Sequence, residues 1–176
     1  MLALGVDPGT AVTGYGLVRL RPGGQMSLVE CGVIRTKSRD PLPSRLAGIF
    51  DGIVEIIERH RPDALALEDV FYARNVRTTV ALGHARGVIM LAGERAGLTV
   101  HEFAPAVVKK AVVGAGAASK DQVQFMVTRL LRLQAPPTPS DAADGVAAAI
   151  TLCMRTRVPT IAALTAAPRA RPARLA

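Results

Sequence analysis

Two short hydrophobic segments, residues 2–7 and 64–68, alternate between large and small side chains. Alternate side chains of a β-strand point to the same face of its sheet, so each segment predicts a strand with one large-residue face and one small-residue face. The small-residue face ends with Asp7 in the first segment and with Glu68 in the second. If the two strands are parallel neighbours, these carboxylates lie side by side at the carboxyl edge of the sheet, where open α/β sheets bind their ligands.

Turn residues and hydrophobic periodicity predict eight further elements. We expect strands over residues 12–19, 27–35 and 99–103, and helices from 46 to Pro62, over 76–96, over 105–112, from Ser119 to Leu131 and over 141–154. This order is typical of an α/β fold in which a five-stranded mixed sheet is flanked by helices on both faces. We expect one domain over residues 1–157. Residues 158–176, rich in Ala, Pro and Arg, are expected to be a flexible basic tail, either a basic arm or a biased terminus without a role.

The chain is basic, with 22 Lys and Arg residues against 14 Asp and Glu residues and a formal net charge of +8. This balance favours a polyanionic partner, either nucleic acid or a membrane surface. A membrane-spanning helix is not expected, because no apolar stretch approaches the ~18 residues that it needs. Cys31 and Cys153 stand alone, which excludes disulfide scaffolds and zinc fingers. Lone thiols and the lack of a recognisable signal peptide predict a cytoplasmic protein.

A second pair of acids opens the last predicted helix. Asp141 and Asp144 are three residues apart and therefore share one helix face. Asp141 has a simple explanation, because the helix dipole favours an acid in the first turn by ~0.3–1 kcal/mol. Asp144 lies among alanines and glycine, where a carboxylate gains little from packing, so a functional role is favoured. The small neighbours would let this helix lie close to the small-residue face of the sheet.

Four carboxylates gathered in one place would repel one another unless a cation neutralised them. Oxygen ligands without His or Cys select Mg²⁺, for which Mn²⁺ can substitute, rather than zinc. Two such ions can activate a water molecule and stabilise the leaving oxygen of a phosphodiester. A basic protein with an acidic metal site is consistent with a nuclease.

Six segments resemble the RuvC family of Holliday-junction resolvases, in the family's order and over about residues 1–155. The segments are Gly5-Val-Asp-Pro-Gly-Thr10, Thr13-Gly-Tyr-Gly16, Leu67-Glu-Asp-Val-Phe71, Gly83-His-Ala-Arg-Gly87, Val108-Lys-Lys-Ala-Val-Val-Gly114 and Asp141-Ala-Ala-Asp-Gly-Val-Ala147.

The resemblance implies an RNase H-like fold and a homodimer that makes two symmetric nicks in four-way DNA junctions by phosphodiester hydrolysis. It assigns catalytic and metal-binding roles, with two Mg²⁺ per subunit, to Asp7, Glu68, Asp141 and Asp144. Some relatives have His in place of Asp141, so this residue either binds metal or positions water. The family also works in bacterial recombinational repair with the branch-migration proteins RuvA and RuvB, which we expect as partners.

Six residues are expected to contact DNA. Adjacent aromatic residues in a loop cannot both be buried on one face, so at most one of Phe71 and Tyr72 belongs to the core. We expect the pair to form a stacking platform or wedge for an unpaired base, which is worth ~1–3 kcal/mol per base. Phe71 matches the family's wedge residue. Arg74 and Arg77 are expected to contact phosphates, and the resemblance places Lys109 and Lys120 near the scissile phosphate. A bound phosphate would also explain a lysine at a helix N-terminus, where the dipole disfavours a cation.

Gly83 and Gly87 lie one turn apart in a predicted helix, where each glycine costs ~1 kcal/mol relative to alanine. Close approach of another backbone would explain them, from this chain's own sheet or from a second subunit. Two other functions remain open. A junction-binding module without nuclease activity would leave the four acids unexplained, and an RNase H-like nuclease acting on structured RNA would leave DNA junctions whole.

Overall fold

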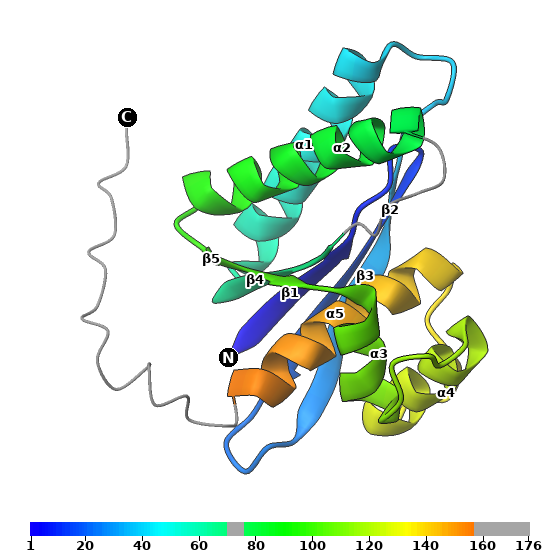
Figure 1. Cartoon of the computed structure of the whole chain (residues 1–176). Helices are drawn as coiled ribbons and strands as arrows, with labels where there is room; N and C mark the ends of the chain where they lie inside the picture. Colours follow the sequence, from blue (N-terminus) through cyan, green and yellow to red (C-terminus); the bar gives the residue numbers. More distant parts are fainter. Residues whose placement is uncertain (70–75, 157–176) are drawn as a thin grey trace.

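The computed structural model describes residues 1–69 and 76–156. Their centre is a five-stranded sheet in the order β3-β2-β1-β4-β5 (Figure 1). The strands are β1 (Leu2–Asp7), β2 (Val12–Leu20), β3 (Met26–Arg35), β4 (Ala64–Glu68) and β5 (Thr99–Phe103). The first three strands form an antiparallel meander, while β4 runs parallel to both β1 and β5. The predicted five-stranded mixed sheet is therefore confirmed.

Helices cover both faces of the sheet, as predicted (Figure 1). The helices are α1 (Leu42–His60), α2 (Val76–Arg95), α3 (Pro105–Val113), α4 (Lys120–Leu130) and α5 (Ser140–Thr156). Helices α1 and α2 lie on one face, and α3, α4 and α5 on the other. Helix α1 begins four residues before the predicted start, directly after Pro41. The prediction missed this first turn because none of its residues is buried, and the buried apolar stripe begins only at Ile49.

The alternation in strand side chains separates two hydrophobic cores. The large residues of β1 and β4, among them Leu4 and Leu65, pack against α1 and α2. The small residues Ala3 and Ala66 pack against the alanines of α5. All four side chains are fully buried. The small-residue face thus lets a helix backbone approach the sheet closely.

Glycines mark where α5 is closest to the sheet. A side-chain carbon added to Gly14 on β2 would collide with the carbonyl oxygen of Asp141. One added to Gly145 would lie 2.6 Å from the Cα atom of Tyr15. Such distances are far inside van der Waals contact, so the helix can take this position only with glycine at both places. This contact fixes the first turns of α5 over the end of β1.

Within residues 1–69 and 76–156, none of the helices has the length and apolar character needed to cross a membrane.

Candidate active site

The ends of two neighbouring strands place the first two carboxylates. In the parallel pair of β1 and β4, Val6 lies opposite Leu67, so Asp7 and Glu68 follow at the same edge. Both side chains leave the small-residue face, as the alternation predicts, and both line one cleft. The two strands are neighbours in the sheet although about sixty residues of chain separate them.

Two side-chain hydrogen bonds hold the turn that follows Asp7. The buried hydroxyl of Thr13 donates a hydrogen bond of 2.7 Å to the carbonyl oxygen of Gly9. The Nε group of Arg45, from α1, donates one of 3.1 Å to the carbonyl oxygen of Thr10. These bonds hold the backbone beside Asp7 in one conformation and thereby restrict where its carboxylate can point.

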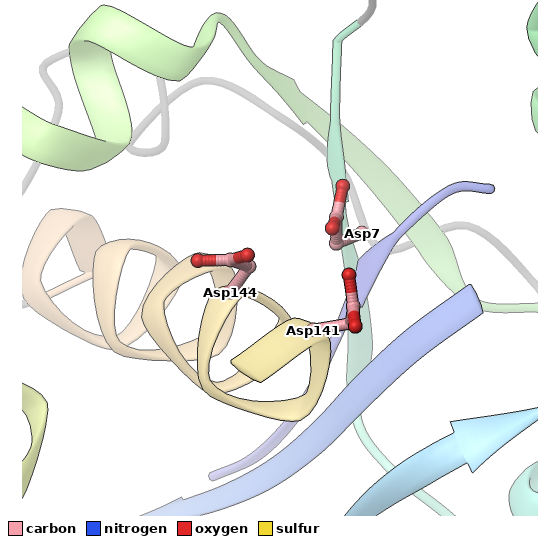
Figure 2. Close-up of side chains that lie close together, drawn as sticks. All are labelled: Asp7, Asp141 and Asp144. Carbon is pink, nitrogen blue, oxygen red and sulfur yellow. The ribbon is translucent and has the colours of Figure 1, made fainter. Parts of the chain in front are cut away.

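Helix α5 supplies the other two carboxylates from its first turns. Figure 2 shows Asp141 and Asp144 on this helix beside Asp7. One carboxylate oxygen from each of these three residues lies within 4.8 Å of the others. Glu68 lies outside this group of three but lines the same cleft as Asp7 and Asp144. We call these four residues the acidic cluster.

Burial and mutual repulsion make three residues of the acidic cluster, Asp7, Glu68 and Asp144, hard to ionise. Burial, followed by the charges of Asp144 and Asp141, raises the pKa of Asp7 to about 7. Burial, followed by the charges of Asp7 and Asp144, raises the pKa of Glu68 to about 8. The pKa of Asp144 is also raised by burial, which outweighs its hydrogen bond with Lys120. If fully ionised, these carboxylates would carry more negative charge than the nearby lysines neutralise.

Lys120 contacts the acidic cluster directly. Its Nζ atom lies 2.8 Å from a carboxylate oxygen of Asp144 and 4.0 Å from one of Asp141. The helix begins there because Ser119 and Gln122 form the predicted capping box. We expected a phosphate to offset the unfavourable dipole at this lysine, but in the chain alone the hydrogen bond with Asp144 does so and raises the pKa of Lys120.

An open cleft of about 240 Å³ lies in front of the acidic cluster. Its polar lining comes from three of the acids and from Lys109 and Lys120. Apolar residues of α3, α4 and α5 form the rest of the wall, and Asp141 does not line it. Lys109 is the second cation of the cleft. Its positive charge offsets part of the rise in the pKa of Glu68 that burial and the neighbouring acids cause.

The donor set suits a hard divalent cation. Among the described residues, the group of three that could hold a metal ion contains carboxylates alone, without His or Cys. Oxygen-only sites favour Mg²⁺, Mn²⁺ or Ca²⁺ over zinc. The raised pKa values point the same way, because a divalent ion would supply the charge that Lys109 and Lys120 do not. The residues present therefore fit such an ion.

The remaining predicted DNA contacts are less well placed or fall outside the description. Phe71, Tyr72 and Arg74 lie outside the described residues. Arg77 is exposed in the first turn of α2 and is not part of the cleft lining. Sequence reasoning missed Arg45, whose contact with the turn after Asp7 joins residues 35 positions apart. No local spacing marks such a contact.

Comparisons with known proteins identify relatives over nearly the whole chain. The family model described as "Crossover junction endodeoxyribonuclease RuvC" matches residues 3–152. A protein of that name from Pelotomaculum thermopropionicum is 50% identical over 150 residues, covering 85% of this chain and 91% of the relative. Another from Chloroflexus aggregans is 46% identical over 161 residues, covering 92% and 96%.

Solved structures give the same result. The structure described as "T. thermophilus RuvC in complex with Holliday junction substrate" matches with a TM-score of 0.81 and 30% sequence identity. The match covers 89% of this chain and 96% of that one. The RNase H-like fold expected from the resemblance is thereby confirmed.

Proposed function

This chain belongs to the RuvC family of crossover junction endodeoxyribonucleases, and we propose that it cuts four-way DNA junctions at the acidic cluster. The observation that carries the proposal is the convergence of Asp7, Asp141 and Asp144 within 4.8 Å, with Glu68 in the same cleft. A relative of known structure was solved with Holliday junction substrate, and this supports a junction as the DNA bound here.

We assign the acidic cluster to two divalent cations per subunit, Mg²⁺ in the first place with Mn²⁺ as a substitute. When bound, the ions supply a water molecule of lowered pKa and positive charge for the reacting phosphodiester. The pKa values of Asp7 and Glu68 are raised to about 7 and about 8 in the chain alone, so these carboxyl groups would have to lose their protons to hold a cation. Asp144 and Asp141 complete the set from α5, with Asp141 binding either metal or a water molecule.

The two lysines of the cleft hold and orient the scissile phosphate. Lys109 faces the cleft from α3, and Lys120 approaches from the first turn of α4. In this proposal Asp144 would hold a cation in place of its ion pair with Lys120, and the ammonium group of Lys120 would bind a phosphate oxygen. The N-terminus of α4 assists it, because helix N-termini attract anions. Phe71, Tyr72, Arg74 and Arg77 remain predicted DNA contacts.

Helix α2 gives the proposed homodimer its interface. Its outward side carries Val80 and Leu91, whose exposed fractions are 52% and 51%. Gly83 and Gly87 lie between them, and added side-chain carbons there would meet nothing within 4 Å. The described part of this chain's own sheet therefore does not explain the two glycines, which leaves the second subunit. A two-fold dimer would place two acidic clusters on the two symmetric strands of a junction.

We further propose that this nuclease acts in the cytoplasm, in recombinational repair, together with RuvA and RuvB. The family of its relatives and the lone thiols of Cys31 and Cys153 support this assignment.

The decisive experiment incubates the chain with Mg²⁺ and a labelled four-way junction, beside a linear duplex built from the same arms. We expect paired, symmetric nicks in the junction alone. Asp7→Asn should abolish the nicks while leaving junction binding intact, because removing an acid does not weaken attraction to DNA. Asp51→Asn, exposed on α1, is the matched control and should cut normally.

Other outcomes would replace the proposal. Binding without cleavage in Mg²⁺ and Mn²⁺, over varied core sequences, would favour a junction-binding module. Cleavage of structured RNA with DNA junctions left whole would favour an RNA nuclease. Cleavage by Asp7→Asn at the wild-type rate would show that the acidic cluster is not the active site.

A further inference from the structure

Arg86 connects α2 with the ends of two strands beside the acidic cluster. One guanidinium nitrogen, Nη1, lies 3.2 Å from a carboxylate oxygen of Asp69, the residue after Glu68. The other, Nη2, pairs with the carboxylate of Glu102 on β5. The arginine side chain is only 17% exposed, whereas its two carboxylate partners are 48% and 46% exposed, so the pairs lie at the edge of the protein with the guanidinium on the inner side.

The two partners of Arg86 stand on either side of Glu68 but on the opposite face of the sheet. Side chains alternate along β4, so Leu67 and Asp69 face α2 while Glu68 faces α5. Glu102 lies opposite Leu67 in the β4–β5 pair and therefore shares its face. The guanidinium group thus joins the side chain that follows Glu68 to the side chain of β5 that lies opposite Leu67, on the face of the sheet away from Glu68.

A backbone hydrogen bond completes the arrangement. The N–H group of Asp69 donates to the carbonyl oxygen of Phe103 at 2.8 Å, continuing the β4–β5 pairing one residue past the strand. Arg86 thereby fixes a segment that the ladder alone would leave at a fraying end. Glu68 is the last residue of β4, so its position depends on that end.

The Nε group of Arg86 argues against a role in stability alone. It is buried, and among the described residues it has no hydrogen-bond partner. An unsatisfied buried donor costs ~1–3 kcal/mol, so a residue selected only for stability would avoid it. The same helix carries the exposed glycines of the proposed dimer face on another side.

We propose that Arg86 is a positioning residue, which holds Glu68 in place for metal binding and connects the α2 dimer face with the acidic cluster. This inference rests on the proposed function, because Glu68 must be a metal ligand. In this proposal Arg86 acts through Asp69 and Glu102 and not by direct contact with DNA or metal.

The test compares Arg86→Ala with Arg95→Ala, an exposed arginine nine residues further along the same helix. Groups that orient metal ligands typically contribute ~10–100-fold in metal affinity or activity. We expect Arg86→Ala to lower the single-turnover cleavage rate by about that factor and to raise the Mg²⁺ concentration for half-maximal rate. Junction affinity in Ca²⁺ should stay within about twofold, and sedimentation should still give a dimer. Arg95→Ala should match the wild type in every respect.

A readout without DNA separates positioning from catalysis. Mn²⁺ should raise the melting temperature of the wild type and of Arg95→Ala, and it should do so less for Arg86→Ala. Arg86→Lys keeps the charge but cannot reach both carboxylates as a fork, so its rate and its Mn²⁺ response should fall between the two. If Arg86→Ala does not fold, Glu102→Gln removes one of the two ion pairs and should show the same changes at smaller size.

The proposal is overturned if Arg86→Ala, or Glu102→Gln in its place, keeps the wild-type rate and Mg²⁺ dependence. It is also overturned if rate, junction affinity and melting temperature fall together without a change in Mn²⁺ response, because that result describes a structural residue. A wild-type chain that cuts no junction would instead refute the proposed function. The Mn²⁺ response would then still report on Arg86.

Discussion

Raising the pH should destabilise the metal-free protein. Asp7 and Glu68 have native pKa values of about 7 and about 8, well above their ordinary values of 3.8 and 4.5. At pH values between the ordinary and the native pKa of each group, the native state binds more protons than the unfolded state. The free energy of unfolding therefore falls as the pH rises. The stabilisation is complete below the unfolded pKa values and is lost as pH passes through the native ones. Most proteins with paired carboxylates show the opposite trend.

The loss of stability is steepest just below pH 6.5, where both native groups still hold their protons, and it continues with a falling slope from pH 6.5 to 8.5. In this range the unfolded carboxylates are already ionised, and both native groups lose their protons. Each pH unit over which one extra proton is held changes stability by about 1.4 kcal/mol. Summed over both groups and reduced for their shared repulsion, the loss is roughly 2–3 kcal/mol. For a chain of this length it corresponds to a fall in melting temperature of about 5–10 °C. His101, whose pKa is lowered by burial, acts below this range.

Urea unfolding followed by circular dichroism, at pH 6.5, 7.5 and 8.5 in EDTA, measures the effect. Adding Mg²⁺ should remove most of the pH dependence, because the cation stabilises the ionised carboxylates. The variant Asp7→Asn/Glu68→Gln should be more stable than the wild type at pH 8.5 and nearly independent of pH. Equal wild-type stability at pH 6.5 and 8.5 in EDTA, or the same slope in the double variant, would refute the reasoning.

Three further predictions concern the packing of α5, the ion pair of Lys120 and the proposed dimer face of α2. Gly14→Ala should lower stability by about 1–3 kcal/mol in thermal unfolding, because it forces α5 away from β2, whereas Gly48→Ala, exposed on α1 with its nearest neighbour 4.0 Å away, should not. Lys120→Met should strengthen Mn²⁺ binding in calorimetry, because the lysine competes for Asp144, and should still slow cleavage; weaker Mn²⁺ binding would contradict this. Leu91→Arg should give a folded monomer in sedimentation, and an unchanged dimer would place the interface elsewhere.

Much of the fold and the meeting of the acids could be predicted from size alternation. A strand with leucine on one face and alanine or glycine on the other must pack against a different layer on each face. The large residues pack against α1 and α2, and the small residues pack against α5. The same alternation put Asp7 and Glu68 on one face, and the parallel pairing of β1 with β4 placed them at one edge. The run of small residues around Asp144 signalled a helix close to that face. The spacing of apolar residues and the size of side chains are local properties of the sequence, so they can be used for prediction without knowledge of the tertiary structure.

The contacts that join distant elements could not be predicted in this way. Arg86 and Arg45 each lie on a helix packed behind the sheet and reach the chain just after Glu68 and Asp7, respectively. Nothing in the spacing of an arginine on a helix says which loop it meets. The ion pair of Lys120 was missed because the helix dipole pointed to an external anion, while the structure supplies an internal one. Such pairings depend on how the helices are placed over the sheet.

The choice of glutamate on β4 and aspartate on β1 follows from the position of α5. Helix α5 makes its closest contacts over Gly5 of β1 and Gly14 of β2, so it lies nearer to Asp7 than to the next strand. A carboxylate on β4 must reach further, and glutamate has one more methylene group. We therefore expect Glu68→Asp, which keeps the charge, to lower the cleavage rate by about 10²-fold, the usual cost of a misplacement of about 1 Å. Fold and junction affinity in Ca²⁺ should be unchanged. Glu68→Asp shortens the side chain but keeps its charge, whereas Glu68→Gln keeps the length but removes the charge, so the two variants distinguish the effects of length and charge. If Glu68→Asp cuts at the wild-type rate, the length of this side chain does not matter.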